Sequence, residues 1–165
     1  MSEQRLHMRL AQKQDCTQLQ AIRAAAFAPV FASFRQILGD VIYEAAQAHE
    51  DADQEKLLSD LFKEDSDWQL WVAEKENEIL GFVSFRLDQL HGSGEIGLNA
   101  VSPEHSGTGI GTAMYDFVLE QMRAAGMRVA TVATGADPSH LAARRAYEKA
   151  GFNVSIPSVW LCRTL

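Results

Sequence analysis

The spacing of apolar residues predicts one short strand and then helices in the first third of the chain. Leu6 to Leu10 alternate with a period of two, which is typical of a strand. Asp15 lies three residues before Gln18, a capping-box pattern that predicts the start of a helix. Pro29 is expected to interrupt that helix, because proline lacks the N–H group that a helix interior needs. A second helix is therefore predicted over about residues 30–49.

The pattern changes from helical spacing to a period of two at Trp68. Just before it, apolar residues recur at helical spacing over residues 57–62 and predict a short amphipathic helix. From there, residues 68–73, 79–90 and 95–102 read as strands separated by polar or glycine-containing turns. Three strands in an antiparallel meander are therefore expected.

The last third of the chain alternates between predicted helices and strands. An amphipathic helix is expected from about Gly109 to a C-cap at Gly126, followed by a β-branched strand over residues 129–134. Asp137 and Pro138 have the pattern of an N-cap and a first helical residue. This helix is expected to end at Gly151, and residues 153–161 are expected to supply one or two terminal strands. The element order predicts an α/β fold with a mixed sheet.

Length and composition narrow the class of protein. The chain has 165 residues, of which 47% are apolar and 22% charged, as in a soluble globular protein with one domain over residues 1–165. The sequence has no apolar run near the roughly 18–20 residues that span a bilayer, so no membrane partner is expected. Residues 1–5 lead into polar sequence without a signal-peptide core. Cys16 and Cys162 lack metal or redox spacing, which predicts reduced thiols, no metal site and a cytoplasmic location.

The negative charge of the chain is concentrated in one segment. The formal charge is −7, from 22 acidic residues against 15 Lys and Arg, which argues against nucleic acid as a partner. Residues 50–67 hold eight acids and two lysines, so this segment alone carries −6. It either faces a cationic substrate and attracts it or forms a solvated outer helix.

A glycine loop between a predicted strand and a predicted helix is the most informative motif. Gly107, Gly109 and Gly111 alternate with other residues and open the helix. Glycine lets the backbone approach a ligand, and a helix N-terminus offers unpaired N–H groups to an anion such as a phosphate. The chain lacks the Gly-Lys-Ser/Thr of nucleotide-hydrolysing loops, and no ribose-binding acid follows at the dinucleotide spacing. A tight turn without a ligand, or a site for another phosphate compound, remains the alternative.

Two motifs together resemble those of the GNAT family of N-acetyltransferases. Val101-Ser102-Pro103 followed by Gly107-Thr108-Gly109-Ile110-Gly111 is similar to the family's acyl-CoA pyrophosphate loop. Some 38 residues on, Ala143 to Phe152, reading ARRAYEKAGF, resembles its C-terminal helix signature. The resemblance implies acetyl-CoA as cofactor and a mostly antiparallel mixed sheet of about six or seven strands flanked by helices.

The resemblance also implies which residues bind the cofactor. The strand over residues 98–101 would diverge from its neighbour and pair with the pantetheine arm. Ser106 stands where the family usually has Gln or Arg, and would offer its backbone N–H and hydroxyl without a cation. His140 stands where the family often has Asn, and would bind pantetheine or lie solvated at the helix start. The expected cofactor-binding residues are Leu98, Asn99, Ala100, Val101, Ser102, Pro103, Ser106, Gly107, Thr108, Gly109, Ile110, Gly111, Thr112, His140 and Tyr147.

Acetyl transfer to an amine needs a base for the amine and an acid for the departing thiolate. By resemblance Tyr147 is the acid, with a core tyrosine as the alternative. Glu95 is the first candidate for the base, with a surface strand charge as the alternative. His91 is a further candidate, and Gly135 stands where some relatives carry a glutamate. The family's acceptor site is typically lined by the helical region that here contains Phe31, Phe34 and Arg35.

The predicted activity is transfer of acetyl from acetyl-CoA to a primary amine by direct attack in a ternary complex. A small cationic metabolite or an aminoglycoside-like amine is the expected acceptor and partner. A protein N-terminus or lysine is the alternative acceptor within the same chemistry, and a CoA-binding sensor with little catalysis is the alternative class. A homodimer is left open.

Overall fold

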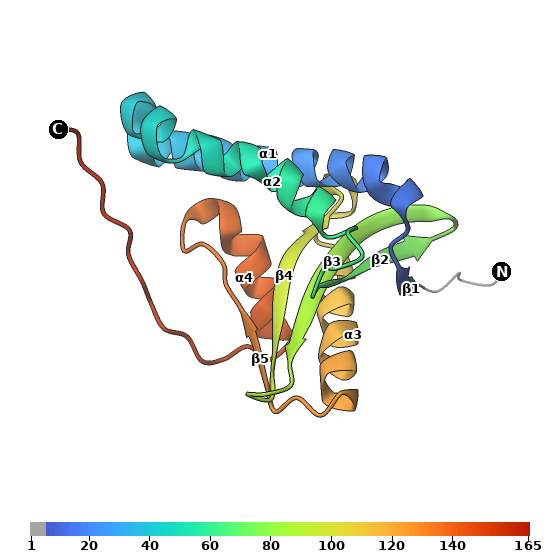
Figure 1. Ribbon diagram of the computed structural model, residues 1–165. Helices are drawn as coiled ribbons and strands as arrows, with labels where there is room; N and C mark the ends of the chain where they lie inside the picture. The colour runs from blue at the N-terminus through green and yellow to red at the C-terminus, as the bar shows by residue number, and fades with distance from the viewer. Residues whose placement is uncertain (1–5) are drawn as a thin grey trace.

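The computed structural model describes residues 6–165, so the expectation for residues 1–5 lies outside the described part of the chain. Five strands form one sheet in the order β1-β2-β3-β4-β5 (Figure 1). The strands β1 to β4 are antiparallel neighbours, and β5 runs parallel to β4. The strands are β1 His7–Leu10, β2 Gln69–Lys75, β3 Glu78–Asp88, β4 Ser93–Val101 and β5 Val129–Val132. The helices are α1 Cys16–Ala46, α2 Ala48–Asp60, α3 Ile110–Ala124 and α4 Leu141–Lys149, and short 3-10 turns lie at Lys13–Asp15, Pro103–His105 and Pro138–His140.

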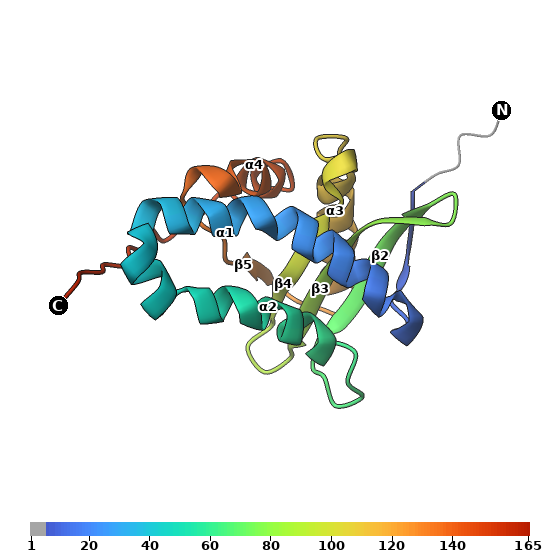
Figure 2. The ribbon, with the colours of Figure 1, turned by 90° about the horizontal axis from the view of Figure 1, so that it is seen from above.

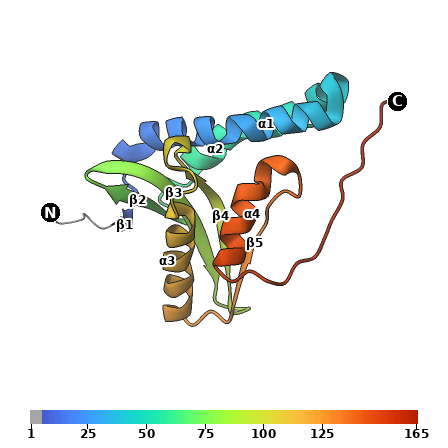
Figure 3. The same cartoon turned by 180° about the vertical axis from the view of Figure 1, so that it is seen from behind.

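Helices cover the sheet from two sides, and each side has its own core. The helices α1 and α2 run side by side over one side (Figure 2), whereas α3 and α4 lie on the other (Figure 3). Under α1 and α2, the buried cluster comprises Leu19, Ile22, Leu58, Leu70, Val72, Ile79, Phe82 and Ala100. Under α3 and α4, it comprises Ala73, Leu80, Val83, Phe85, Ile96, Ile110, Met114, Tyr115, Val118, Leu119, Met122 and Tyr147. The fold is therefore an α/β fold with a mixed sheet, as predicted.

The helix α1 continues through Pro29, where the sequence pattern predicted a break. Both Pro29 and Ala25 are exposed. The carbonyl of Ala25, which would accept the N–H that proline lacks, therefore lies on the solvent side of the helix, where water can satisfy it. The interruption falls instead at Gly39, whose φ of 72° and ψ of 161° are not helical. Glycine adopts such a positive φ without the steric cost that a side chain brings.

The acidic segment forms most of α2 and the loop that follows it. The predicted amphipathic helix is present, but it extends over Ala48–Asp60 and buries Leu58 while leaving Leu57 half exposed. Asp51 is buried and accepts a hydrogen bond of 2.7 Å from the hydroxyl of Tyr43. That hydrogen bond to a carboxylate raises the pKa of Tyr43 above its ordinary value. Asp51 therefore fastens α2 to α1.

The predicted meander of β2, β3 and β4 is confirmed, but the strand count is lower than the six or seven expected. Among residues 6–165 the sheet has five strands, because residues 153–161 form no strand in the structure. They belong to an exposed tail over residues 153–165 that runs away from the sheet (Figure 1). A strand needs a neighbour to pair with, and this segment has none in the described chain.

The helix α1 contains a long apolar stretch, although the sequence analysis found no apolar run long enough to span a bilayer. The helical segment Lys13–Ala46 is long and apolar enough to cross a membrane by length and composition alone. Core helices of soluble proteins and signal sequences can have the same length and composition, so this feature is only weak evidence for a membrane-spanning helix. Leu19 and Ile22 of this helix pack on the sheet, in the cluster under α1 and α2. The most apolar stretch of the segment is itself not buried in the described structure.

Candidate functional site

The parallel pair β4 and β5 separates halfway along β4. Pairing runs from Ser93 opposite Val129 to Ile96 opposite Val132, and it ends there. Beyond Ile96, β4 continues to Val101 while pairing only with β3. The backbone groups of Gly97 to Val101 that point toward β5 therefore lack a strand partner in the described chain. This is the divergence that the resemblance implied for residues 98–101.

A bulge in β4 sets which way its side chains point at the divergence. The register shifts so that Val83 lies opposite Asn99 but Phe85 lies opposite Ile96. Gly97 and Leu98 therefore both lie opposite Ser84. The Ser84 hydroxyl donates a hydrogen bond of 2.9 Å to the Leu98 carbonyl. After the bulge, Leu98 and Ala100 face the α1 side, and Asn99 and Val101 face the α3 side. The bulge thus brings the Asn99 side chain to the side that carries α4.

The glycine loop connects the end of β4 to α3 and leaves the start of α3 uncapped. Gly107 and Gly109 have φ of 77° and 88°, a conformation that favours glycine. Gly109 is the N-cap residue of α3 and has no side chain to bond the first N–H groups of the helix. A Cβ added at either glycine would meet nothing within 4 Å, so the loop surface is open. Gly111 lies within α3, where a Cβ would make only ordinary contacts, at 3.7 Å or more.

The loop uses some of its own N–H groups internally. The N–H of Ser102 donates to Leu80 at 2.7 Å, and that of Ser106 donates to Pro103 at 3.2 Å. In this structure the backbone N–H of Ser106 is therefore engaged within the loop and its hydroxyl is the group left for a ligand. Cofactor binding by Ser106 stays a prediction. Gly107 and Gly109 donate no backbone hydrogen bond in the described chain. The Nδ1 atom of His105 is buried without a hydrogen-bond partner among these residues, which is unusual for a buried polar atom.

Tyr147 lies buried on α4 and is held by a polar side chain of β4. Its hydroxyl oxygen accepts a hydrogen bond of 3.1 Å from the Asn99 amide nitrogen. The same amide nitrogen donates to the Gly97 carbonyl at 2.9 Å, which fixes the orientation of the amide because a carbonyl can only accept. The Asn99 amide oxygen accepts from the hydroxyl of Tyr115 at 2.8 Å. This arrangement leaves the hydroxyl proton of Tyr147 free to be donated elsewhere.

The rings around Tyr147 exclude water from its phenol. The ring of Tyr115 lies 4.6 Å from it between centroids, and that of Phe152 lies 5.9 Å away at a steep angle. Burial, followed by the neighbouring Tyr147, raises the pKa of Tyr115 well above its ordinary value. Tyr115 therefore stays protonated and acts as a fixed donor to Asn99. The sequence analysis missed Tyr115, although it lies within the amphipathic helix predicted from about Gly109 to Gly126.

His140 and Asp137 form a polar cluster where α4 begins. The ring nitrogen Nδ1 of His140 lies 2.5 Å from Asp137, and its ring stacks on Phe34 of α1. The hydroxyl of Ser33, also on α1, donates to Asp137 at 2.8 Å. Burial opposes ionisation of Asp137, but hydrogen bonds from Ser139, Ser33 and His140 outweigh it and lower the pKa of this carboxyl. Because Nδ1 faces Asp137, the Nε2 atom is the ring nitrogen of His140 left for a ligand.

Gly135 leaves the space that the His140–Asp137 cluster occupies. A Cβ added at Gly135 would lie 2.4 Å from Nδ1 of His140 and 2.7 Å from Asp137. Arg144 holds the loop from one turn into α4 by donating to the carbonyls of Gly135 and Asp137 at 2.7 and 2.9 Å. A glutamate at position 135 would collide with this arrangement. Asp137 caps the 3-10 turn Pro138–His140 rather than α4 itself, which starts at Leu141.

Glu95 lies on the α1 side of the sheet, two residues before the divergence. Its carboxylate is half exposed and bonds Arg86 at 2.6 Å, and Arg86 lies over the ring of Trp68. Glu95 lines a cavity of about 540 Å³. The full lining is Asp67, Arg86, Leu87, Asp88, Gln89, Ser93, Glu95 and Thr131. With three carboxylates and one guanidinium, this cavity carries net negative charge.

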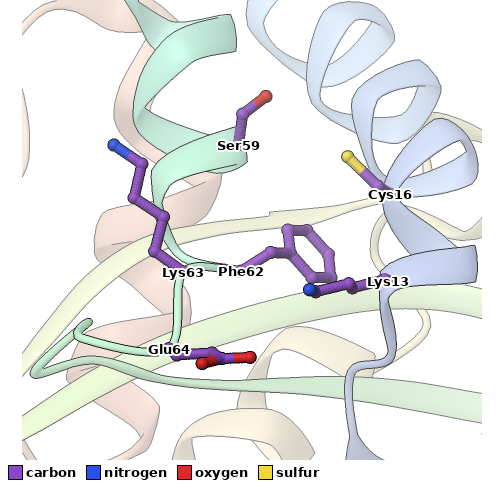
Figure 4. A pocket seen from close by; sticks show the side chains of 6 residues that line it. All are labelled: Lys13, Cys16, Ser59, Phe62, Lys63 and Glu64. Carbon is purple, nitrogen blue, oxygen red and sulfur yellow. The ribbon is translucent and has the colours of Figure 1, made fainter.

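Other parts of the chain are set apart from this site. A second cavity of about 380 Å³ lies where the start of α1 meets the end of α2, and none of the predicted site residues lines it (Figure 4). Arg35 bonds Asp40 and Glu44 and covers Tyr43, so it does not point to the divergence. His91 bonds Asp88 in the turn after β3. Within residues 6–165, no three His, Cys, Asp or Glu side chains are grouped so that they could hold a metal ion.

The match to a family model assigns the class of protein. Residues 32–152 match the model of the acetyltransferase (GNAT) family, so the chain belongs to this family. The chain is therefore an acetyltransferase enzyme. No curated protein sequence matches it closely enough to count as a relative.

Solved structures share the fold at low sequence identity. A GNAT family acetyltransferase from Brucella melitensis in complex with acetyl-CoA is 22% identical with a TM-score of 0.62, over 92% of this chain and 84% of that one. The ribosomal-protein-S18-alanine N-acetyltransferase from Escherichia coli is 15% identical with a TM-score of 0.66, over 92% and 80%. The aminoglycoside N-acetyltransferase AAC(6')-Iy in complex with CoA is 13% identical with a TM-score of 0.66, over 99% and 98%. At these identities the likeness shows the fold.

Proposed function

We propose that this enzyme transfers the acetyl group of acetyl-CoA to a primary amine of a small cationic molecule, by direct attack in a ternary complex. The observation that carries the proposal is the hydroxyl of Tyr147 held by Asn99 beside the opened edge of β4. Its proton is free, it is shielded from bulk water, and it lies beside residues 97–101, whose backbone edge toward β5 has no strand partner among the described residues and could pair with a ligand.

The residues at the glycine loop fit the pyrophosphate of CoA. The N–H groups of Gly107 and Gly109 have no internal acceptor, and those at the start of α3 have no side-chain cap. A helix N-terminus with its partial positive charge stabilises phosphate. The open space over both glycines lets a bulky phosphate reach the backbone, and Nδ1 of His105 is a buried polar atom that residues 6–165 leave without a hydrogen-bond partner. We further propose that Nε2 of His140 faces the pantetheine arm.

The thioester of acetyl-CoA would supply the activated acetyl group, and the protein would supply positioning and proton transfer. The free N–H groups of β4 beyond Ile96 would hold the thioester carbonyl, since donors fixed in place stabilise the oxyanion that develops there. The Tyr147 hydroxyl would give its proton to the departing sulfur. The Asn99 amide would then stabilise the phenolate with the same N–H that it donates in the resting enzyme.

The acceptor would approach from the α1 side, on which Glu95 lies. The cavity there holds Asp67, Asp88 and Glu95, an arrangement that attracts an ammonium group. We propose Glu95 as the base that removes the amine proton, directly or through one water. Asp67 is the only acid of the segment 50–67 in that lining. This supports a solvated outer helix for most of the segment and a substrate role for Asp67 alone.

A small amine is favoured over a protein N-terminus or lysine because the acidic cavity is compact. The AAC(6')-Iy enzyme acts on an aminoglycoside and the Escherichia coli enzyme on an alanine of a ribosomal protein, so the fold accommodates both classes. Both thiols of the chain are free, which fits the proposed cytoplasmic location.

The test is thiol release from acetyl-CoA with spermidine, an aminoglycoside, a peptide with N-terminal alanine and a lysine peptide. Turnover with the first two supports the proposal, and turnover with the peptides alone contradicts it. Binding of CoA with no turnover of any amine would mean a sensor.

A further inference from the structure

A buried arginine on α1 has no acidic partner in the described chain. Arg23 is only 7% exposed, yet none of the ion pairs found among residues 6–165 includes it. Its side chain makes one hydrogen bond in this part of the chain, from Nε to the amide oxygen of Gln20 at 2.7 Å. Both terminal nitrogens of the guanidinium therefore lack an acceptor among these residues. A buried charge costs free energy unless it is paired, so a ligand of negative charge would stabilise Arg23.

The side chain of Gln20 fixes the orientation of this guanidinium. Gln20 donates through its amide nitrogen to the Glu55 carbonyl at 2.8 Å and to the Ser59 hydroxyl at 3.1 Å, both on α2. Its amide oxygen is therefore the atom turned to Arg23, because a carbonyl can only accept a proton. The guanidinium is thus held at the α2 side of α1, and the two helices run side by side (Figure 2). Since Nε is bound to Gln20, the two terminal nitrogens are the ones left for a ligand.

The guanidinium is covered but not sealed off from solvent. Among residues 6–165, the one fully covered side-chain nitrogen or oxygen without a hydrogen-bond partner is Nδ1 of His105, so the terminal nitrogens of Arg23 keep contact with solvent. The adjacent Ile22 and, one turn further, Phe27 pack in the cluster under α1 and α2, to which Leu98 of β4 also contributes. Arg23 therefore lies on the side of the sheet from which the acceptor is proposed to approach the opened stretch of β4.

We propose that Arg23 binds a carboxylate of the acceptor, so that the acceptor is an amine that also carries a carboxylate, such as an amino acid with a second amine in its side chain. This inference rests on the proposed function. The terminal nitrogens of a guanidinium present parallel N–H groups that match the two oxygens of a carboxylate. The ammonium groups of the acceptor would lie toward the acidic cavity of Asp67, Asp88 and Glu95. An acceptor of this class keeps a net positive charge.

The acceptor, rather than acetyl-CoA, is the source of this anion in the proposed arrangement. CoA carries phosphates but no carboxylate, and its pyrophosphate is assigned to the glycine loop at the start of α3. The helix α3 lies on the opposite side of the sheet from α1 (Figures 2 and 3). A phosphate on the acceptor would bring a second negative charge to the side that holds Asp67, Asp88 and Glu95, and these carboxylates would repel it. A carboxylate therefore fits Arg23 better than a phosphate.

Matched pairs of amines test the proposal in the thiol-release assay. L-lysine is compared with cadaverine and L-ornithine with putrescine, since each diamine lacks only the carboxylate of its partner. In the wild-type enzyme, kcat/KM is expected to be about 10–100-fold higher for the carboxylate-bearing member of at least one pair, because it alone satisfies Arg23. Equal rates within both pairs, or higher rates with the diamines, would overturn the proposal.

Variants of Arg23 assign the preference to this side chain. Arg23→Met removes the charge but keeps an unbranched side chain, and it is expected to lose the preference within the pairs while still turning over the diamines. Arg23→Lys keeps the charge without the forked donors and should show an intermediate preference. The matched control is Arg123→Gln, which removes an exposed guanidinium from α3 and should keep the full preference. Melting curves establish that each variant is folded, and a preference that survives in folded Arg23→Met would overturn the proposal.

Direct binding separates this inference from the proposed acetyl transfer. Isothermal titration of the CoA-bound enzyme with the same four amines measures affinity without turnover. Tighter binding of a carboxylate-bearing amine that is lost in Arg23→Met supports the carboxylate site, even if no amine is acetylated and the proposed transfer fails. Turnover of the diamines with no carboxylate preference in rate or affinity would contradict the carboxylate site and leave the proposed transfer standing.

Discussion

The Asn99 amide donates a hydrogen bond of 3.1 Å to the hydroxyl of Tyr147, joining residues that lie 48 positions apart in the chain. The bulge at Gly97 and Leu98 makes this contact, since it turns Asn99 toward α4. Asn99 is a positioning residue that acts through Tyr147. Its amide also accepts from Tyr115, so one side chain fixes two phenols in different roles.

Asn99→Asp should lower kcat about 10–100-fold. The two carboxylate oxygens would accept hydrogen bonds from both phenols, so the Tyr147 proton would be engaged by the carboxylate rather than available to the departing sulfur. The KM for acetyl-CoA should change little. Steady-state kinetics with thiol detection measure both values. The control is Tyr115→Phe, which removes one donor to Asn99 but leaves the amide N–H on Tyr147, and it should cost much less. Equal losses in the two variants would contradict the assigned geometry.

Gly109→Ala should weaken CoA binding about tenfold, because a left-handed φ of 88° costs a side-chain residue about 1–2 kcal/mol and the loop would shift. Isothermal titration with CoA gives the affinity. Gly126→Ala is the matched control: Gly126 has a φ of 82° at the opposite end of α3, so it should lose similar stability without losing affinity. Unchanged CoA affinity in Gly109→Ala would remove the loop from the cofactor site.

Glu95→Gln should lower kcat/KM for the amine about 100-fold near neutral pH, since the amide keeps a hydrogen bond to Arg86 but cannot take a proton. Asp88→Asn lies in the same cavity, where Asp88 is bound to His91, and it should affect amine KM more than kcat. A Glu95→Gln enzyme with normal turnover would assign the base to another group.

Asp137 should make the stability of the protein fall at low pH. Its pKa is lower in the folded chain than its ordinary value of 3.8, so its contribution is present above that value and is lost as the pH falls through the folded pKa. Urea unfolding from about pH 6 to about pH 2 measures this loss. In Asp137→Asn the fall should be smaller, whereas Asp40→Asn, on an exposed carboxylate of α1, should retain it. Identical pH dependence in wild type and Asp137→Asn would contradict this account.

Local patterns in the sequence predicted most of the fold but missed how distant segments meet. The meander and the glycine loop were predictable because turn residues and a period of two mark them within a few positions. The continuity of α1 through Pro29 was not, since it depends on which side of the helix faces water. The missing terminal strands depend on a pairing partner that no local pattern specifies.

The candidate site was likewise predictable only in part. The motifs predicted the positions of Tyr147 and of Gly107 to Gly111, because each motif is contiguous. The contact of Asn99 with Tyr147 depends on a bulge, and the stacking of His140 on Phe34 depends on the crossing of two helices. The roles of Glu95 and of the cofactor-binding residues stay predictions. A contiguous pattern cannot show which side chains face one another across a sheet.

The most direct test of the central claim is the kinetics of Tyr147→Phe. This change removes only the hydroxyl and keeps the ring between Tyr115 and Phe152, so the fold should be preserved. The account predicts that kcat falls about 10²–10⁴-fold while KM for acetyl-CoA changes by less than about threefold. An unchanged kcat, or a loss confined to KM, would contradict Tyr147 as the acid that protonates the departing thiolate.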